Sequence, residues 1–184
     1  RQQYDRLFSA TSPGVLQRRA VLHGFEQVST TADYEHPKRI WSEFRAEHVE
    51  NRGSKALLRK WDFQELAGGG TTAVERQTIG LRELRLNEML RVQAPELHAD
   101  LLEPVGSAAA DDVTTNFVEA YRLPASIERL AEHLARQPDM PFEERRSLAK
   151  SILARFVKLH TLGIAHRDIT KRTLWVVEPS RVIL

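Results

Sequence analysis

The sequence lacks cysteine, long apolar segments and any large excess of charge of one sign. Without cysteine, this chain forms no disulfide, no thiolate metal site and no cysteine nucleophile. No apolar run approaches the roughly 20 residues that a membrane helix requires. The 27 Lys and Arg residues against 25 Asp and Glu leave a net charge of +2, which is too small to predict a nucleic-acid or membrane partner. These absences predict a soluble, cytoplasmic protein.

What the chain does contain is typical of an ordered, globular protein. It has 184 residues, of which 41% are hydrophobic and 28% charged, enough for one domain or two small lobes. Its 21 Arg against 6 Lys residues favour a GC-rich, bacterial source. Because the chain begins at Arg1 and stops inside the apolar run 182–184, we expect it to be a fragment of a longer protein.

The first two thirds of the chain predict a sheet with one helix. Residues 1–19 carry little periodicity and are predicted to be a linker or the end of a preceding region. The triplet Gly68 to Gly70 is predicted to be a linker before a helix over 72–92, because apolar residues there recur with helical spacing. Extended segments are predicted at 20–28, 40–49, 56–63, 101–105 and 115–121.

The last third predicts two helices and a hairpin. Ser126 is predicted to cap a helix that carries Ile127, Leu130 and Leu134 on one face. A longer helix follows Pro141, and Gly163 ends it. Its apolar stripe consists of Leu148, Ile152, Phe156, Leu159 and Leu162. An apolar hairpin over 174–177 and 181–184 closes the chain, so the predicted fold class is α+β.

The segment between the long helix and the hairpin carries the most informative motif. It reads His166-Arg167-Asp168-Ile169, with Thr173 five residues after the aspartate. This motif resembles the catalytic loop of a protein kinase, His-Arg-Asp followed by a hydrophobic residue and, later, Asn. An exposed loop with an ordinary carboxylate is the alternative, but the amphipathic helix before the motif and the apolar hairpin after it favour the kinase resemblance.

The resemblance implies a two-lobed fold and specific roles in the loop. Asp168 would orient the acceptor hydroxyl and accept its proton. Lys171 or Arg172 would stabilise charge on the phosphoryl group in transfer. Arg167 would pair with an activation-loop phosphate in kinases that are regulated in this way.

A kinase also carries a strand lysine that contacts the nucleotide phosphates. By the spacing of apolar residues, Arg59 rather than Lys60 occupies the lysine position, although the assignment stays ambiguous. Because side chains alternate along a strand, only one of the two faces the nucleotide.

The resemblance further implies a helix glutamate and a strand that contacts adenine. Glu83 is the expected ion-pair partner of the strand cation, with Glu75 and Glu88 as competitors. The segment containing Glu119 and Tyr121 resembles the hinge, where backbone groups would meet the adenine edge. A solvated helix face and a buried strand are the alternatives.

Two features depart from the kinase pattern. Thr173 stands where kinases place the Asn that holds a second magnesium, and a neutral hydroxyl is a weaker ligand for that ion. No glycine occurs between Thr30 and Lys38, where a glycine-rich phosphate loop is expected. Both departures place metal and phosphate binding in question.

The sequence therefore predicts a protein-kinase-like N-lobe at 20–121 and a partial C-lobe at 122–184. The expected function, for the full-length protein, is phosphotransfer from ATP, with Mg²⁺, to a protein Ser or Thr. A pseudokinase that binds nucleotide or partners is the rival, and a small-molecule phosphotransferase is the third alternative. With Trp175 after a Thr in place of the loop Asn, the chain resembles divergent bacterial kinases of phage-defence systems, so other domains or a defence complex are expected partners.

Overall fold

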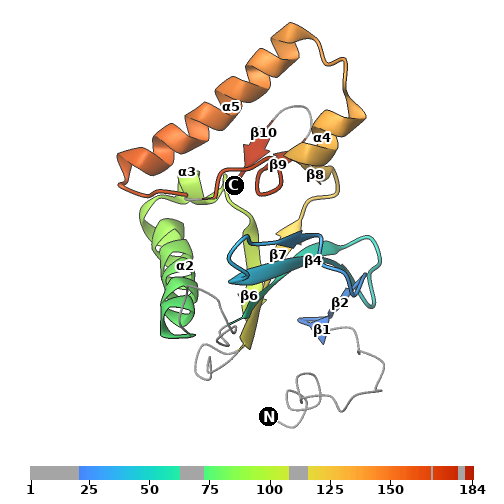
Figure 1. The fold of residues 1–184 in the computed structure, drawn as a ribbon, viewed down its shortest axis with the longest axis vertical. Coiled ribbons are helices and arrows are strands. Elements are labelled where there is room, and N and C mark those ends of the chain that lie inside the picture. The colour runs from blue at the N-terminus through green and yellow to red at the C-terminus, as the bar shows by residue number, and fades with distance from the viewer. Residues whose placement is uncertain (1–20, 63–72, 108–115, 167, 178–180) are drawn as a thin grey trace. The chain divides into compact units, whose positions relative to one another are not determined.

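The structure is a computed structural model that describes residues 21–62, 73–107, 116–166, 168–177 and 181–184. It is an α+β chain in which helices accompany two sheets (Figure 1). The described residues divide into two compact units. The first unit contains residues 21–62, 73–81, 104–107 and 116–123, and the second contains residues 82–103 and the described part of 124–184. The predicted linkers at 1–19 and at Gly68 to Gly70 lie outside the described residues.

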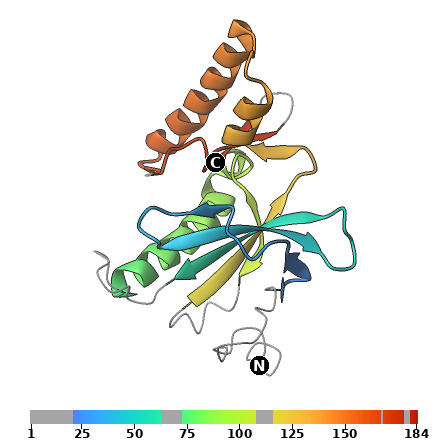
Figure 2. The same cartoon turned by 45° about the vertical axis from the view of Figure 1, so that its right-hand side comes forward.

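The first unit is built on one sheet (Figures 1 and 2). Its strands in spatial order are β1 (Val21–Leu22), β2 (Phe25–Gln27), β4 (Trp41–His48), β5 (Lys55–Asp62), β7 (Asn116–Leu123) and β6 (Glu103–Ser107), with β3 (Tyr34–Glu35) also paired to β4. The central pairs β4–β5 and β5–β7 are antiparallel.

Alternation along β5 explains how this sheet forms a core. Ala56 and Leu58 point to one face, where they pack with Val118 and Ala120 of β7 in a cluster of buried residues. Arg59 and its same-face neighbours point to the other side. One face of the sheet therefore carries a buried apolar cluster together with exposed polar residues such as Lys60, and the other face also holds buried polar groups such as Glu43 and Glu119.

The predicted strand over 20–28 is interrupted in the structure. His23 and Gly24 adopt positive φ angles of 50° and 80°, which turn the chain between β1 and β2. A Cβ atom on Gly24 would lie 2.6 Å from Nε2 of His48, so the turn requires glycine both for its φ angle and for space.

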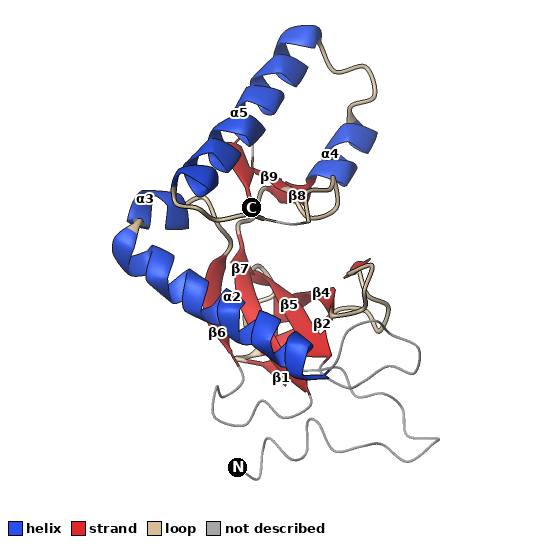
Figure 3. Ribbon diagram, turned by 60° about the vertical axis from the view of Figure 1, so that its left-hand side comes forward, coloured by secondary structure: helices blue, strands red, loops and turns tan. Residues whose placement is uncertain are grey.

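The second unit combines helices with a small sheet (Figure 3). Helix α2 (Ala73–Gln93) begins in the first unit and continues into the second. The further helices are α3 (Pro95–His98), α4 (Leu130–Arg136) and α5 (Phe142–Thr161). The sheet has the order β10 (Arg181–Ile183), β9 (Trp175–Val177), β8 (Ile127–Arg129), and both of its pairs are antiparallel. No helix among the described residues has the length and apolarity needed to cross a membrane.

Helix α5 packs against strand β10 at the edge of this small sheet. The Ser151 hydroxyl accepts the N–H of Val182 at 3.3 Å, and Arg155, one turn later, donates Nε to the Val182 carbonyl at 3.3 Å. These two side chains pair with backbone groups on an edge strand that would otherwise face solvent. The buried core of the unit includes Leu148, Phe156, Leu159, Val176 and Val182.

Most of the predicted elements are present, but the segment after Pro124 was predicted incorrectly. Ile127 lies in strand β8, and helix α4 begins at Leu130 with Arg129 as its N-cap residue. The reason is tertiary: Arg129 pairs with Trp175 across the sheet, and that pairing overrides the local helical pattern. Strand β3 and helix α3 were not predicted. The first unit ends at Leu123 and the second resumes at Pro124, whereas the boundary between the lobes was predicted at 122. Residues 82–103, which lie inside the predicted N-lobe, belong to the second unit.

Candidate functional site

The residues singled out from the sequence fall into two sets, one in each unit. Asp168, Lys171, Arg172 and Thr173 lie in the loop between α5 and β9, in the second unit. The strand and hinge residues of the resemblance lie in the sheet of the first unit. Each set has its own geometry.

The loop of the second unit starts from a well-defined helix end. Gly163 has φ 70°, its N–H donates to the His160 carbonyl at 2.9 Å, and the Ile164 N–H donates to the Leu159 carbonyl at 3.0 Å. These bonds satisfy the last carbonyls of α5 and turn the chain out of the helix. The ring of His166 then lies edge-on to Phe156 of α5, with centroids 5.7 Å apart. The first histidine of the motif therefore anchors the loop to the helix.

Thr173 closes the loop from inside. Its hydroxyl donates to the Asp168 carbonyl at 2.6 Å and accepts the N–H of Thr170 at 3.0 Å. It also lies 3.3 Å from the Thr170 hydroxyl oxygen. The Thr173 hydroxyl thus contacts groups of its own loop, and its hydrogen bond fixes the backbone at Asp168.

The start of helix α4 binds the other end of the loop. The N–H of Leu130 donates to the Leu174 carbonyl at 2.8 Å, and the N–H of Ala131 donates to the Lys171 carbonyl at 2.7 Å. The first N–H groups of a helix have no partner within the helix, so these loop carbonyls supply the acceptors that α4 needs. The same two bonds fix the loop carbonyls in place.

Arg129 reinforces this junction and was not identified from the sequence. The residue is buried, its guanidinium lies 4.4 Å from the centroid of the Trp175 ring, and its Nη1 donates to the Arg172 carbonyl. The Glu132 carboxylate accepts the Arg129 N–H at 2.9 Å. An arginine three residues before a glutamate carries no recognisable signal in sequence, and Trp175 is distinctive there only through the family resemblance.

A second polar group joins strand β8 to helix α4. The His133 ring is buried, and its Nδ1 lies 2.8 Å from Oε1 of Glu128. Arg136 donates a hydrogen bond to the same carboxylate. The hydrogen bond from Arg136 lowers the pKa of Glu128, and the bond from His133 adds to this effect, while burial opposes it. Glu128 therefore stays ionised and ties β8 to α4.

The anchored loop presents one carboxylate residue together with two cations. Asp168 is half-buried, whereas Lys171 and Arg172 are exposed. A half-buried carboxylate in a fixed loop is suited to orient a hydroxyl and take its proton, and nearby cations are suited to bind anionic oxygens. Arg167 lies outside the described residues.

In the first unit, Arg59 and Lys60 differ as strand alternation predicts. Lys60 is exposed, whereas the Arg59 guanidinium donates Nε and Nη2 to Oε1 of Glu43 at 2.9 and 2.8 Å. Glu43 on β4 was not identified from the sequence. The partner that we observe for Arg59 is therefore a carboxylate in the same sheet.

Glu119 and Tyr121 lie inside strand β7 and are buried. Glu119 is opposite Arg59 across the β5–β7 pair, and its Oε2 accepts the Trp61 indole N–H at 2.6 Å. Strand β7 has β5 on one side and β6 on the other. Its backbone at these two residues therefore belongs to a sheet ladder, which does not favour the expected contact with an adenine edge.

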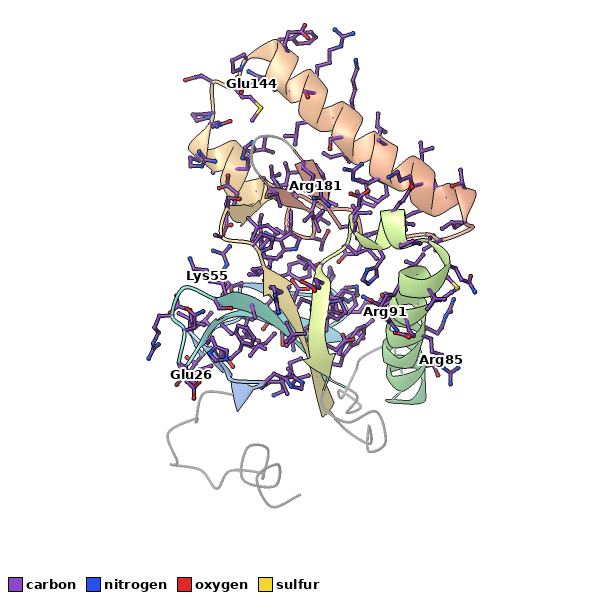
Figure 4. The ribbon with its side chains drawn as sticks, turned by 180° about the vertical axis from the view of Figure 1, so that it is seen from behind. Glu26, Lys55, Arg85, Arg91, Glu144 and Arg181 are labelled. Atoms are coloured by element: carbon purple, nitrogen blue, oxygen red, sulfur yellow. The ribbon has the colours of Figure 1, made fainter. Side chains whose placement is uncertain are left out.

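The three glutamates considered as helix partners lie on α2 but have different surroundings. Glu83 is exposed. Glu88 is also exposed, and its Oε1 forms an ion pair with Nη2 of Arg91 at 2.6 Å. The hydrogen bond from Arg91 lowers the pKa of Glu88. Figure 4 shows Arg85 and Arg91 on the same helix. The side chain of Glu75 lies outside the described ones.

The metal site that the kinase resemblance implies requires ligating side chains that lie together. Within the described ranges, no three His, Cys, Asp or Glu side chains are grouped so as to hold a metal ion. Thr173, the predicted ligand, directs its hydroxyl into its own loop. A hard cation prefers charged oxygens, whereas the Thr173 hydroxyl is neutral and already bonded within its loop.

Comparison with known proteins does not assign the chain to a family. No protein-family model matches the sequence, and no curated protein matches it.

Proposed function

We propose that this chain forms part of a protein-kinase-like, two-lobed fold, and that the full-length protein transfers phosphate from ATP to a Ser or Thr hydroxyl of a protein. The order of elements supports this proposal: strands and a helix, further strands, then helices, the His166 motif and a hairpin. Further domains of the same polypeptide, or a bacterial defence complex, are the proposed partners.

Asp168 is proposed to act on the acceptor. The hydroxyl oxygen of the substrate forms a bond to the γ-phosphorus, the bond between that phosphorus and the ADP oxygen breaks, and the hydroxyl proton passes to the Asp168 carboxylate. Lys171 and Arg172 bind the anionic oxygens of the transferred group. Magnesium normally neutralises charge in such reactions, and the described residues include no group of three ligating carboxylate or imidazole side chains that would hold it.

The observation that carries the proposal is the anchoring of the Asp168 loop. His166 packs on Phe156, Thr173 holds the Asp168 carbonyl, and α4 binds the far end of the loop. An ordinary surface loop has no need of three separate anchors. A catalytic carboxylate does need them, because small displacements of a reacting group lower the rate strongly.

The test is the substitution Asp168→Asn in the full-length protein. Removal of the base is expected to lower phosphotransfer to a Ser-containing protein acceptor by about 10²- to 10⁴-fold while the melting temperature stays nearly constant. The matched control is Asp139→Asn, because Asp139 is an exposed aspartate in the turn before α5. Retained transfer in Asp168→Asn would show that the carboxylate is not the base.

A binding module without catalysis is the second candidate, and the geometry of Arg59 favours it. The guanidinium that would contact phosphates is already bonded to the buried carboxylate of Glu43. A guanidinium held in this way can still contact a phosphate, but it brings less net positive charge to a transferring phosphoryl group than a lone cation would. Wild-type protein that binds an ATP analogue but transfers no phosphate would select this candidate.

A further inference from the structure

Arg59 sits at the centre of a row of charges that crosses three strands. The β4–β5 register places Glu43 opposite Arg59, and the β5–β7 register places Glu119 opposite Arg59 on the other side. Directly opposed residues on one face of a sheet are close enough for their side chains to interact. A positive residue therefore lies between two carboxylates, all three on the same face.

The bond to Glu43 is close and shielded from water. Two nitrogens of the Arg59 guanidinium, Nε and Nη2, reach the same oxygen of Glu43 at 2.9 and 2.8 Å. The side chain of Glu43 is 4% exposed and that of Arg59 is 21% exposed. A charge-assisted bond in such surroundings is stronger than one in water, so the removal of either partner is costly.

Aromatic rings fix the remaining freedom of the guanidinium. The Cζ atom of Arg59 lies 5.5 Å from the centroid of the Trp41 ring and 5.2 Å from that of Tyr121. Both distances lie within the range of cation–π attraction. The Trp41 and Trp61 rings are themselves 5.1 Å apart. The direction of Arg59 is thus set by side chains of β4, β5 and β7.

From this geometry we infer that Glu43 is the positioning residue for Arg59, in the role that the kinase resemblance gives to Glu83. The inference rests on the proposed function, in which Arg59 contacts the nucleotide. In protein kinases the partner glutamate is on a helix, and movement of that helix controls the ion pair. Here the pair is formed inside one sheet, so the cation is held ready whatever the state of α2. Nucleotide binding is then constitutive at this residue.

The pair itself is tested by double-mutant cycles on the equilibrium constant for unfolding of the protein. The first cycle combines Glu43→Gln with Arg59→Gln, and the control cycle combines Glu83→Gln with Arg59→Gln. Coupling of about tenfold is expected in the first cycle and none beyond about twofold in the control. The inference is overturned by coupling in the control cycle or by its absence in the first.

The positioning role is tested by the affinity of the full-length protein for a fluorescent ATP analogue. We expect Glu43→Gln and Arg59→Gln each to weaken binding about tenfold, and Glu43→Asp, which keeps the charge, to recover part of the loss. Glu83→Gln should bind as the wild type does. Weakened binding in Glu83→Gln together with normal binding in Glu43→Gln would overturn the inference. If the wild type binds no analogue, the proposed function fails, and the unfolding cycles still decide whether Glu43 holds Arg59.

Discussion

Thr173 stands where protein kinases place an asparagine, and its contacts explain what a hydroxyl does there. It joins the backbone at Asp168 to the backbone at Thr170 through one donated and one accepted hydrogen bond. A side chain that lacks a hydroxyl leaves both backbone groups without this partner. The residue therefore matters for the shape of the loop before any question of metal binding arises.

Substitution of Thr173 by Val should loosen the loop. The two side chains have nearly the same shape, so the change removes the hydroxyl alone, and we expect the free energy of unfolding to fall by about 1–3 kcal/mol. Thr173→Ser keeps the hydroxyl and serves as the control. Chemical denaturation measures the loss, and limited proteolysis between 164 and 174 locates it. Equal behaviour of the Val and Ser variants would contradict this role.

Single residues show where sequence-based inference stops. The opposite directions of Arg59 and Lys60 followed from strand alternation, because that rule needs no partner. Glu43 was missed because its position depends on the register of a hairpin. A turn centred on Arg52 and Gly53 would place Ala46 opposite Arg59, whereas the observed hairpin places Glu43 there. A shift in register decides which side chains meet, and the sequence does not reveal it.

At the scale of elements, Asp100 connects three parts of the second unit. Its buried carboxylate lies 3.0 Å from Nε of Arg155 and 3.2 Å from Nζ of Lys158, both on α5. Its Oδ1 is 3.5 Å from Nη2 of Arg181 on β10, a residue labelled in Figure 4. The backbone of Asp100 also accepts the N–H of Leu184 at 3.0 Å. One carboxylate thereby ties the segment after α3 to the long helix and to the last strand.

Loss of this carboxylate charge should destabilise the second unit. Asp100→Asn leaves three cations near one another without their common anion, and we expect the free energy of unfolding to fall by about 3 kcal/mol. Asp139→Asn, at an exposed turn, should change it by less than about 0.5 kcal/mol. Thermal and denaturant unfolding of both variants provide the measurement. A similar stability of the two variants would mean that solvent already screens the Asp100 cluster.

Elements with a strong periodic pattern were predicted well, and elements fixed by their neighbours were not. Helix α5, which ends at Thr161 just before Gly163, is present because its apolar stripe and the glycine after it agree, although Leu162 of the predicted stripe lies beyond the helix and is exposed. The short strands β3 and β8 exist only through their pairing with β4 and β9. Two or three residues carry too little pattern to be recognised alone, and for β8 a helical spacing of Ile127 and Leu130 pointed to the wrong element.

At the scale of the whole molecule, each unit has a core of its own. Leu58 is 1% exposed in the cluster of the first unit, and Val182 is fully buried in that of the second. The kinase-like fold of the whole chain stays a prediction. It depends on how the His166 motif and the sheet of the first unit act together, and no local sequence pattern reveals that. The α+β class, in contrast, followed from local patterns.

Separate cores should make the two units respond separately to core substitutions. Leu58→Ala is expected to cost about 2–5 kcal/mol, and the amide protection lost in hydrogen exchange should be concentrated in β4, β5 and β7. Val182→Ala should instead reduce protection in α5 and β9. Uniform loss of protection over both units in either variant would show that the described chain unfolds as one cooperative body.

The anchors of the Asp168 loop have a consequence for recognition by the loop. Fixing the backbone of a flexible segment costs about 1–2 kcal/mol of entropy for each residue. A mobile loop loses that free energy each time it binds a ligand. In this chain the loop backbone is already fixed when the protein folds. The hydrogen bonds at Gly163, at the Thr173 hydroxyl and at the first N–H groups of α4 fix it. The loop then acts as a rigid template, which selects ligands by their fit to a shape that exists before they arrive.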